Sequence, residues 1–354
     1  MPGYALLILP SSNRVYADSA VALTIAELTL FSDSVLGGRL TEIGEAVIGG
    51  VRYVTFGSAG ELSEDDAALL ANVSSAYALF SRQADGALRP VELRPLGKFD
   101  DDLITIQKYQ GKTNEQFTKL LLNATLLSSA RAGGFLTGKF SVLDPLCGRG
   151  TTLNQALMYG WDASGIDLDG KDFDAYEAFI KTWLKRKLIK HKTELVPIRR
   201  DRKLVGRRMT VRFAAEKAEY LAGETQLLDV VNADTVKAGQ FFKPASFDLI
   251  VTDAPYGVKH GSRAPANGAL ARSPLDLLAA ALPGWTALLR PGGAIGLASN
   301  TFVAKREAVA AMLADAGLTV LVNGPYLRFA HRVDQAINRD ILIARKPPGD
   351  HTQD

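Results

Sequence analysis

The sequence of 354 residues contains very little cysteine, since Cys147 is its single one. One thiol cannot form an internal disulfide, and the four scattered histidines show no metal-ligand spacing. No apolar run approaches the roughly 20 residues that cross a bilayer. The first residues, MPGYALLILPSSNR, lack the basic leader and cleavage site of a signal peptide. We therefore expect a cytoplasmic protein without a metal site or a membrane span.

Acidic residues are scarce in one basic segment. The whole chain has a net charge of +3, but residues 181–212 carry 13 Lys and Arg residues against Glu194 and Asp201. A concentrated positive field on an otherwise acidic body indicates a polyanionic partner, with a solvated charged face as the alternative. The nucleic-acid contacts that we predict from this segment are Lys185, Arg186, Arg199, Arg200, Arg202, Lys203, Arg207 and Arg208.

Residues 1–93 predict a small α+β domain. The apolar patterns predict strands at 4–9, 40–48, 51–56 and 75–82, a helix from Asp18 or Ser19 to about Phe31, and a second helix over 63–71. The order β-α-β-β-α-β is typical of a ferredoxin-like fold. Residues 94–112 show no clear period and predict a linker.

From residue 113 to 348 strands alternate with helices, which predicts a parallel sheet covered on both faces. A capping-box pattern, Thr113 to Gln116, precedes the first helix. The expected strands are 141–146, 163–168, 227–234, 247–253, 293–299, 318–322 and 340–346, the last two joined as a hairpin. We expect a helix from about Lys171 to Lys190, which ends inside the basic insertion 181–213. The rest of the insertion should form a hairpin that turns around Gly206. Seven strands of this kind fit a doubly wound α/β sheet.

One strand-to-helix loop, in VLDPLCGRGTTLNQAL (142–157), has the features of a ligand-binding loop. The strand ends at Asp144 and Pro145, and a short glycine-containing turn leads into a helix that begins near Thr151. Glycines let the backbone approach a ligand closely, and a helix N-terminus offers unpaired N–H groups. The pattern is neither GxGxxG nor a P-loop. An ordinary strand-to-helix turn is the alternative.

Acidic residues follow the next two strands. An acid at the end of the second strand of an α/β sheet commonly binds a ribose diol, for which Asp167 is the better candidate and Asp169, a possible helix cap, the other. Asp234, after the third strand, can accept a hydrogen bond from the exocyclic amino group of adenine. The alternative is a solvated acid in a loop.

The segment TDAPYG (252–257) places polar and aromatic groups at the end of a buried strand. A carboxylate only accepts hydrogen bonds. Asp253 and the carbonyl of Ala254 can therefore hold the two hydrogens of a nucleobase amino group, while Tyr256, after Pro255, stacks on the base. A turn with a surface tyrosine is the simpler alternative.

Taken together and in this order, YQGKTNEQFTKLLLN (109–123), LDPLCGRGTT (143–152), GIDLD (165–169), NAD (232–234) and TDAPYG resemble class I S-adenosylmethionine-dependent amino-methyltransferases with a D/N/S-P-P-Y/F motif. Within that class, the chain is most similar to the tRNA guanine-N2 methyltransferases that carry a THUMP region. The resemblance spans residues 105–346. It implies a Rossmann-like seven-stranded class I methyltransferase sheet that follows the smaller N-terminal domain.

The resemblance also assigns roles to residues of this chain. S-adenosyl-L-methionine is the implied cofactor, Asp167 would bind its ribose and Asp234 its adenine, and Asp253 with Tyr256 would hold the target base. Residues that the resemblance and the loop pattern place around the rest of the cofactor are Asp144, Pro145, Cys147, Gly148, Gly150, Thr151, Gln110, Lys112, Thr113 and Asn114. We interpret Cys147 itself as a small packing residue.

Two features depart from the family pattern. Ala254 replaces the usual proline, but its carbonyl is retained, so we expect a slightly softer site that still functions. The N-terminal region of 93 residues has room for the ferredoxin-like unit but not obviously for a THUMP domain as well. The basic insertion, extended by Arg328, His331 and Arg332, could replace it in binding tRNA.

The resulting expectation is methyl transfer to an exocyclic amino group of a nucleobase, guanine N2 in tRNA. A DNA adenine-N6 or cytosine-N4 methyltransferase uses the same acceptor geometry on a flipped base and is the nearest alternative. An RNA-binding protein with a degenerate, non-catalytic methyltransferase domain is the alternative from another class.

Overall fold

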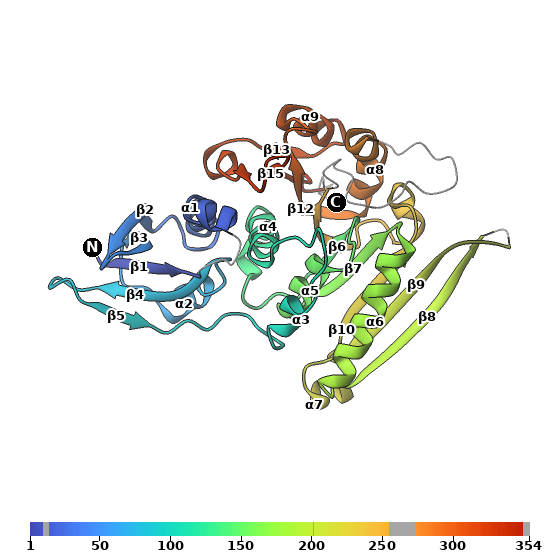
Figure 1. Ribbon diagram of the computed structural model, residues 1–354, viewed down its shortest axis with the longest axis horizontal. Coiled ribbons are helices and arrows are strands. Elements are labelled where there is room, and N and C mark those ends of the chain that lie inside the picture. Colours follow the sequence, from blue (N-terminus) through green and yellow to red (C-terminus); the bar gives the residue numbers. More distant parts are fainter. Residues whose placement is uncertain (10–13, 201, 255–272, 350–354) are drawn as a thin grey trace, which may run out of the picture.

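The computed structural model describes residues 1–9, 14–200, 202–254 and 273–349, which form two β-sheets lying side by side (Figure 1). The N-terminal sheet has the strand order β2-β3-β1-β4-β5, and all of its neighbours are antiparallel. Its elements are β1 (Gly3–Ile8), α1 (Arg14–Val35), β2 (Leu40–Ile48), β3 (Val51–Ser58), α2 (Glu64–Leu70), β4 (Ala76–Arg82) and β5 (Leu88–Val91).

The ferredoxin-like pattern of this sheet is confirmed by its first four strands and two helices. Ser63 caps α2 in a reciprocal capping box with Asp66. Two details differ from the expectation. Helix α1 begins at Arg14, four or five residues earlier than predicted, and β5 adds a fifth strand at the edge.

The second sheet has the order β13-β15-β12-β11-β6-β7-β10-β9-β8. Its strands are β6 (Ser141–Asp144), β7 (Asp162–Asp167), β8 (His191–Arg200), β9 (Lys203–Phe213), β10 (Gln226–Asn232), β11 (Phe247–Asp253), β12 (Leu289–Asn300), β13 (Thr319–Leu321), β14 (His331–Arg332) and β15 (Asn338–Arg345). Its helices are α3 (Asp102–Thr105), α4 (Glu115–Leu127), η1 (Ala132–Gly134), α5 (Thr151–Met158), α6 (Gly170–Arg186), α7 (Lys217–Ala222), η2 (Thr235–Gln240), α8 (Pro274–Leu288), α9 (Arg306–Asp315) and η3 (Gly324–Leu327).

All seven expected strands are present, in the order of the class I methyltransferase sheet. Strands β10, β7, β6, β11 and β12 are parallel, and β15 enters antiparallel between β12 and β13. The predicted fold class is therefore confirmed. The chain order reverses direction across the sheet between β6 and β11, which is where α/β sheets of this type bind ligands.

Alternating residues of the buried strands feed two separate cores. Val142, Leu249 and Val251 face the core under α4, α5 and α6, whereas Leu143 and Ile250 face the core under η2, α8 and α9. A fully buried parallel strand is apolar on both sides, which is why these strands appear in the sequence as continuous apolar runs.

The first of these cores continues into the N-terminal sheet. Helix α1 packs on α4, and Phe31 lies 5.3 Å from Phe135 between ring centroids. Residues 94–112, which we expected to be a linker, contain α3 and pack against α5, α6 and β9 of the second domain. The indole nitrogen of Trp183 donates to Asp102 at 2.8 Å.

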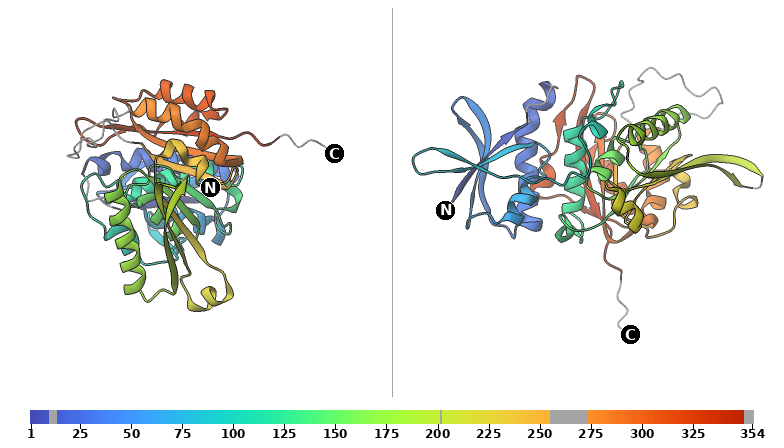
Figure 2. Two further views of the ribbon diagram at one scale, coloured as in Figure 1. Left: turned by 90° about the vertical axis from the view of Figure 1, so that its right-hand side faces the viewer. Right: turned by 90° about the horizontal axis from the view of Figure 1, so that it is seen from below.

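The basic insertion forms a long antiparallel hairpin, β8 and β9, that extends the sheet beyond β10 and runs out past the rest of the molecule (Figures 1 and 2). Helix α6 ends at Arg186 instead of Lys190. The expected turn at Gly206 is wrong, because the strands reverse between Arg200 and Lys203. Gly206 lies within β9, where a Cβ atom would meet the carbonyl oxygen of Asn232 at 2.5 Å.

Across the described ranges, no helix combines the length and apolar character that a membrane span requires.

Candidate active site

A cavity of about 330 Å³ lies at the carboxyl ends of β6 and β11. The ligand loop after β6 forms one side, the segment before α4 forms the second, and Asp253 with Ala254 forms the third. Its lining residues are Tyr109, Gln110, Gly111, Thr113, Asp144, Leu146, Cys147, Gly148, Arg149, Thr151, Thr152, Asp172, Asp253 and Ala254. The tertiary structure thus brings three of the segments singled out in the sequence to one cavity.

Asp144 is a buried carboxyl at the end of β6. Its Oδ1 accepts from the Thr252 hydroxyl at 2.9 Å and from the backbone N–H of Leu146 at 3.1 Å. Burial raises the pKa of Asp144 to about 7, against the lowering effect of these hydrogen bonds, and the nearby charge of Asp253 adds to the rise. A cationic group in the cavity would favour the ionised form of Asp144.

Asp167 ties the ligand loop to the end of β7. Its Oδ2 accepts from the N–H of Gly148 and its Oδ1 from the N–H of Asp169, both at 2.8 Å. Burial raises its pKa to about 6 despite these bonds. Asp169 caps α6 through the N–H of Lys171, so the helix-cap interpretation holds for Asp169. Asp167 is therefore the acid positioned beside the loop.

The two glycines of the loop serve different purposes. Gly148 has a φ of 49° and open space where a side chain would begin, which leaves room for close approach of a ligand. Gly150, at φ 80°, caps α5, and a Cβ there would lie 2.4 Å from the ring of Tyr176. Gly150 is thus required by packing.

Cys147 is buried against Gly165, and burial raises the pKa of its thiol, which agrees with a packing role. Pro145 is buried too, without lining the cavity.

The segment before α4 lies over the ligand loop. Tyr109 Oη and Thr151 Oγ1 are 3.1 Å apart, and the guanidinium of Arg149 lies 4.8 Å from the Tyr109 ring centroid. Arg149 Nε also lies 2.8 Å from Asp172. The sequence analysis missed Tyr109, Arg149 and Asp172 as site residues. Tyr109 and Arg149 lie inside the segments 109–123 and 143–152, and Asp172 follows the segment 165–169, which was the available signal.

The predicted capping box before α4 is wrong by one residue. Asn114 caps the helix by accepting from the N–H of Phe117 at 3.1 Å, which leaves the hydroxyl of Thr113 for another partner. Lys112 donates to the carbonyl of Ile104 at 2.7 Å and pairs with Glu115. Lys112 and Asn114 therefore fix the segment without lining the cavity, whereas Gln110 and Thr113 line it.

Asp253 is held at the cavity by two residues from distant parts of the chain. The Thr113 hydroxyl donates to its Oδ2 at 2.8 Å, and Arg339 Nη2 lies 3.6 Å from the same oxygen. Arg339, on β15, is buried and lies over the ring of Phe117, 4.3 Å from its centroid. No local motif marks Arg339, so the sequence analysis missed it. These contacts fix the orientation of the carboxylate.

Ala254 is buried, and its N–H donates to the carbonyl of Ala298 on β12 at 2.9 Å. Proline has no N–H and could not form this bond. The bond holds the turn on the sheet, which argues against the less rigid site that we expected from the replacement of proline by alanine. Pro255 and Tyr256, the other two predicted residues of this motif, lie outside the described residues.

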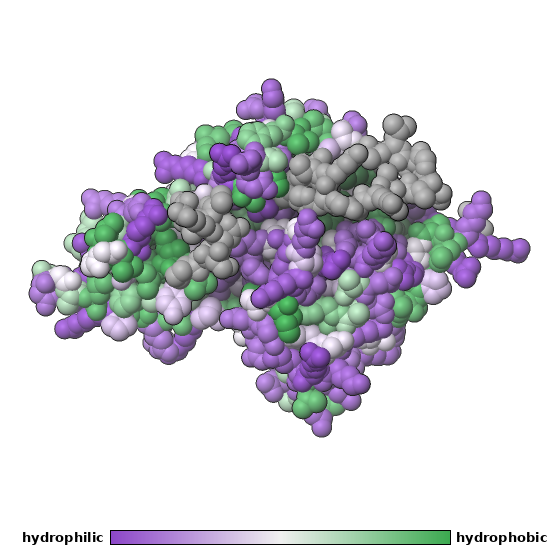
Figure 3. All heavy atoms as spheres, in the orientation of Figure 1, coloured by the Kyte–Doolittle hydropathy of each residue, from purple (hydrophilic) through white to green (hydrophobic). Residues whose placement is uncertain are grey.

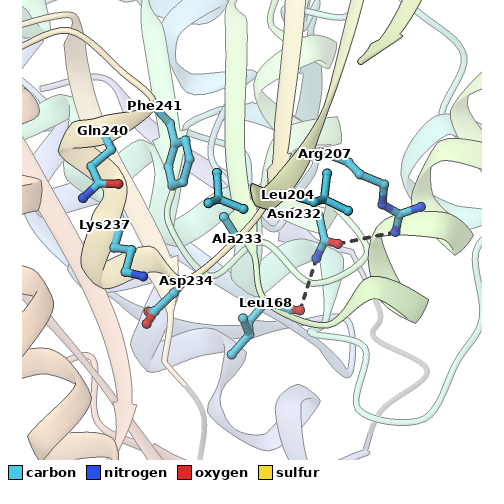
Figure 4. A pocket seen from close by; sticks show the side chains of 11 residues that line it. Leu168, Leu204, Arg207, Asn232, Ala233, Asp234, Lys237, Gln240 and Phe241 are labelled. Carbon is cyan, nitrogen blue, oxygen red and sulfur yellow. Dashed lines mark hydrogen bonds between the residues drawn. The ribbon is translucent and has the colours of Figure 1, made fainter. Parts of the chain in front are cut away.

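A second pocket, of about 430 Å³, lies at the ends of β7 and β10 (Figure 4). Asp234 lines it and caps η2 through the N–H of Val236 at 3.0 Å. Leu168, which directly follows Asp167, also lines it and is 70% exposed. The pocket thus contains the acid that the resemblance assigns to adenine.

The predicted basic residues differ in what they contact. Arg208 binds Asp229 through Nε at 2.7 Å and through Nη2, and Arg207 Nη1 lies 2.7 Å from Asp174. Within the described part of the chain, Lys185, Arg186, Arg199, Arg200, Arg202 and Lys203 are exposed and form no ion pair. Four of these cations, Arg199, Arg200, Arg202 and Lys203, lie at the hairpin tip, where hydrophilic side chains project (Figure 3), whereas Lys185 and Arg186 belong to the last turn of α6.

The suggested extension of the basic surface in the last hairpin is wrong for His331. This residue is buried, its ring packs 5.2 Å from the Phe117 ring between centroids, and burial lowers its pKa to about 4. A neutral, buried imidazole contributes no positive surface. Arg328 and Arg332 are exposed.

The strand order, the loop after β6 and the cavity at the switch point are those of the class I methyltransferase fold. A model of the RMKL-like methyltransferase domain family (UPF0020) matches residues 122–294, which run from α4 into β12. The expected cofactor is thereby confirmed as S-adenosyl-L-methionine. The residues fit it, since open space lies beside Gly148 and two acids of the expected set line the pockets, Asp144 the first and Asp234 the second. Asp167, expected at the ribose, lines neither pocket and instead holds the loop through the N–H of Gly148.

Solved structures similar to the chain include TrmN from Thermus thermophilus, with 15% identity, 98% of this chain and 100% of that chain covered, and a TM-score of 0.44. Another is the 1,6-didemethyltoxoflavin-N1-methyltransferase of Burkholderia thailandensis, with 15% identity, 59% and 72% coverage and a TM-score of 0.35. The N-methyltransferase NodS from Bradyrhizobium japonicum has 15% identity, 66% and 95% coverage and a TM-score of 0.36. Among curated proteins, none matches the chain.

Proposed function

We propose that the protein transfers a methyl group from S-adenosylmethionine to an exocyclic amino nitrogen of a nucleobase, guanine N2 in tRNA. The observation that carries this proposal is the Asp253 carboxylate, which Thr113 and Arg339 orient at the cavity edge. A carboxylate has about four acceptor positions, so Asp253 can accept a substrate N–H in addition to these contacts.

The chemistry needs an amino lone pair that is otherwise delocalised into the aromatic ring. Asp253 accepts one N–H of the amino group and the backbone carbonyl of Ala254 accepts the other, which favours a pyramidal nitrogen with its lone pair directed at the electrophile. The bound cofactor supplies a methyl group on a sulfonium centre. A nitrogen–carbon bond forms, the carbon–sulfur bond breaks with its electrons going to sulfur, and the nitrogen then loses one proton to solvent.

The preference for tRNA is supported by charge. The exposed cations near the hairpin tip suit a phosphate backbone, and contacts of this kind give affinity without choosing a sequence. The ferredoxin-like front end, as in the family that the sequence resembles, favours RNA over DNA. The nearest alternative remains methylation of adenine or cytosine in DNA.

The proposal is tested by incubating the protein with isotopically labelled S-adenosylmethionine and either bulk tRNA or duplex DNA. Nucleosides from the digested product are then separated by mass spectrometry. We expect label in N2-methylguanosine from tRNA. Label in N6-methyladenine or N4-methylcytosine from DNA would support the alternative substrate. Calorimetric titration without heat of binding for the cofactor would instead indicate a non-catalytic RNA-binding protein.

Charge reversal at the hairpin tip is expected to weaken tRNA binding. In the double variant Arg199→Glu, Lys203→Glu, the Kd for tRNA should rise at least about tenfold at moderate salt, and the slope of log Kd against log salt concentration should fall by about two. The measurement is fluorescence anisotropy over a salt series. Arg207 and Arg208 are left intact, because their ion pairs with Asp174 and Asp229 would make their reversal disruptive.

The matched control is Arg212→Glu, Lys217→Glu, which makes the same change in charge at the base of the hairpin. Because ten paired residues separate the base from the tip, the two positions lie about 30 Å apart. We expect the control to change the Kd by less than threefold. Equal losses in both variants would mean that net charge, and not the tip, governs binding.

A further inference from the structure

The pocket at the ends of β7 and β10 is bounded on its outer side by the inserted hairpin. Leu204, Val205, Gly206 and Arg207 of β9 line it, opposite Leu168 and the η2 segment (Figure 4). Strand β9 pairs with β10 up to Asn232, so the β9 residues before Arg207 extend past the end of β10. The insertion thereby adds a wall to a pocket that the rest of the sheet leaves open.

Leu204 and Val205 are apolar side chains that remain 60% and 39% exposed. Together with Leu168, Ala233 and Phe241 they give the pocket apolar walls, and Asp234 supplies a carboxylate. The polar part of the lining is completed by Arg207, Asn232, Lys237 and Gln240. Apolar walls with a carboxylate acceptor suit a flat heteroaromatic ring that carries an amino group. The volume of about 430 Å³ falls in the range of pockets for small ligands.

A side-chain bridge connects the hairpin to the segment that carries Asp167. Arg207 Nη2 donates to Asn232 Oδ1 at 3.4 Å, and Asn232 Nδ2 donates to the backbone carbonyls of Asp167 at 2.9 Å and Leu168 at 3.1 Å (Figure 4). Arg207 is itself fixed over the ring of Phe173, 4.8 Å from its centroid. Through this bridge, a displacement of β9 would reach the backbone of Asp167, the expected ribose ligand, and of Leu168.

We propose that Leu204 and Val205 of the hairpin cover the adenosine end of the cofactor, so that binding of nucleic acid to the hairpin strengthens cofactor binding. This inference rests on the proposed function, which supplies both ligands. The position of the pocket favours adenosine as its occupant over a nucleobase of the substrate. Leu168, which lines the pocket, directly follows Asp167, the expected ribose ligand. Asp167 and Asp234 follow or end neighbouring strands at the same edge of the sheet. The reciprocal effect is that cofactor tightens nucleic-acid binding by the same factor.

The test compares two double variants of the same hairpin by calorimetry with S-adenosylhomocysteine as the probe. Leu204→Ser, Val205→Ser removes the apolar wall. Leu195→Ser, Val196→Ser removes two apolar residues of similar exposure, 44% and 47%, that do not line the pocket. Without nucleic acid, we expect the Kd of the first variant to rise about tenfold and that of the second to stay within twofold of the unaltered protein. Thermal unfolding midpoints check that both variants are folded.

Repeating the titration with saturating tRNA measures the coupling. The unaltered protein and the control should bind S-adenosylhomocysteine more tightly with tRNA present, and the Leu204→Ser, Val205→Ser variant should lose that gain. An unchanged Kd in this variant overturns the inference, as does a variant that loses tRNA affinity alone, which would make the pocket a nucleobase site. Failure of the unaltered protein to bind the probe contradicts the proposed function instead, so the two failures are distinguishable.

Discussion

Replacing Asp253 with asparagine is expected to lower kcat for methyl transfer by at least about a hundredfold. The variant keeps the size of the side chain but exchanges one acceptor oxygen for a donor NH2, which opposes the substrate N–H instead of holding it. Affinity for S-adenosylhomocysteine should stay within about threefold, because the residues assigned to the cofactor lie on other loops. Single-turnover kinetics with tRNA and calorimetry with the probe measure the two effects separately.

Thr113→Val provides a graded comparison for the same site. It removes the hydroxyl that donates to Asp253 Oδ2 but keeps the shape of the side chain and leaves Arg339 in place. We expect kcat to fall by about three- to thirtyfold, less than in Asp253→Asn. An Asp253→Asn protein with normal kcat would refute the proposed role of this carboxylate. If Asp253→Asn lost probe binding and activity to the same extent, the role of Asp253 would be structural.

Cofactor binding is expected to tighten as the pH rises from 5.5 to 7.5. Burial raises the pKa of Asp144 to about 7 and that of Asp167 to about 6, so both carboxyls gain charge across this range. The ionised forms bind a cationic methionine end and ribose hydroxyls better than the protonated forms. The Kd for S-adenosylhomocysteine should therefore fall by about three- to tenfold per pH unit below the pKa of Asp144. Calorimetry in matched buffers measures it.

Asp144→Asn is the control for this dependence, because asparagine resembles the protonated carboxyl and keeps an oxygen for Thr252 and Leu146. The variant should bind the probe weakly and show a flatter pH profile. The stability of the cofactor-free protein depends on pH in the opposite direction to cofactor binding. A carboxyl whose pKa is raised on folding binds more protons in the folded state, so the cofactor-free protein loses stability as the pH rises from about 4 through 7. If the Kd of Asp144→Asn for the probe changed with pH as it does in the unaltered protein, the pH dependence of binding would belong to other groups.

The sequence by itself determined the fold class and the order of its strands. Strands such as LIV at 249–251 are buried on both faces, and this forces a continuous apolar run that is visible in one dimension. Ligand loops are equally local. Gly148 and the N-terminus of α5 belong to one short stretch, and Asp144, Asp167 and Asp253 each stand where a buried strand ends. Carboxyl ends of parallel strands meet at one edge, so acids in those positions could be expected to converge.

What the tertiary structure alone decided is which side chains oppose one another across elements far apart in the chain. Thr113 resembled a helix cap, yet its hydroxyl contacts Asp253. Arg339 belongs to no motif, yet β15 brings it to the same carboxylate. Within the basic insertion, Arg208 and Arg199 have the same charge in the sequence, but only Arg208 meets an acid, Asp229. Such pairings depend on strand register and packing, which a linear pattern does not encode, and they determine how the site holds its carboxylate and where positive charge remains exposed.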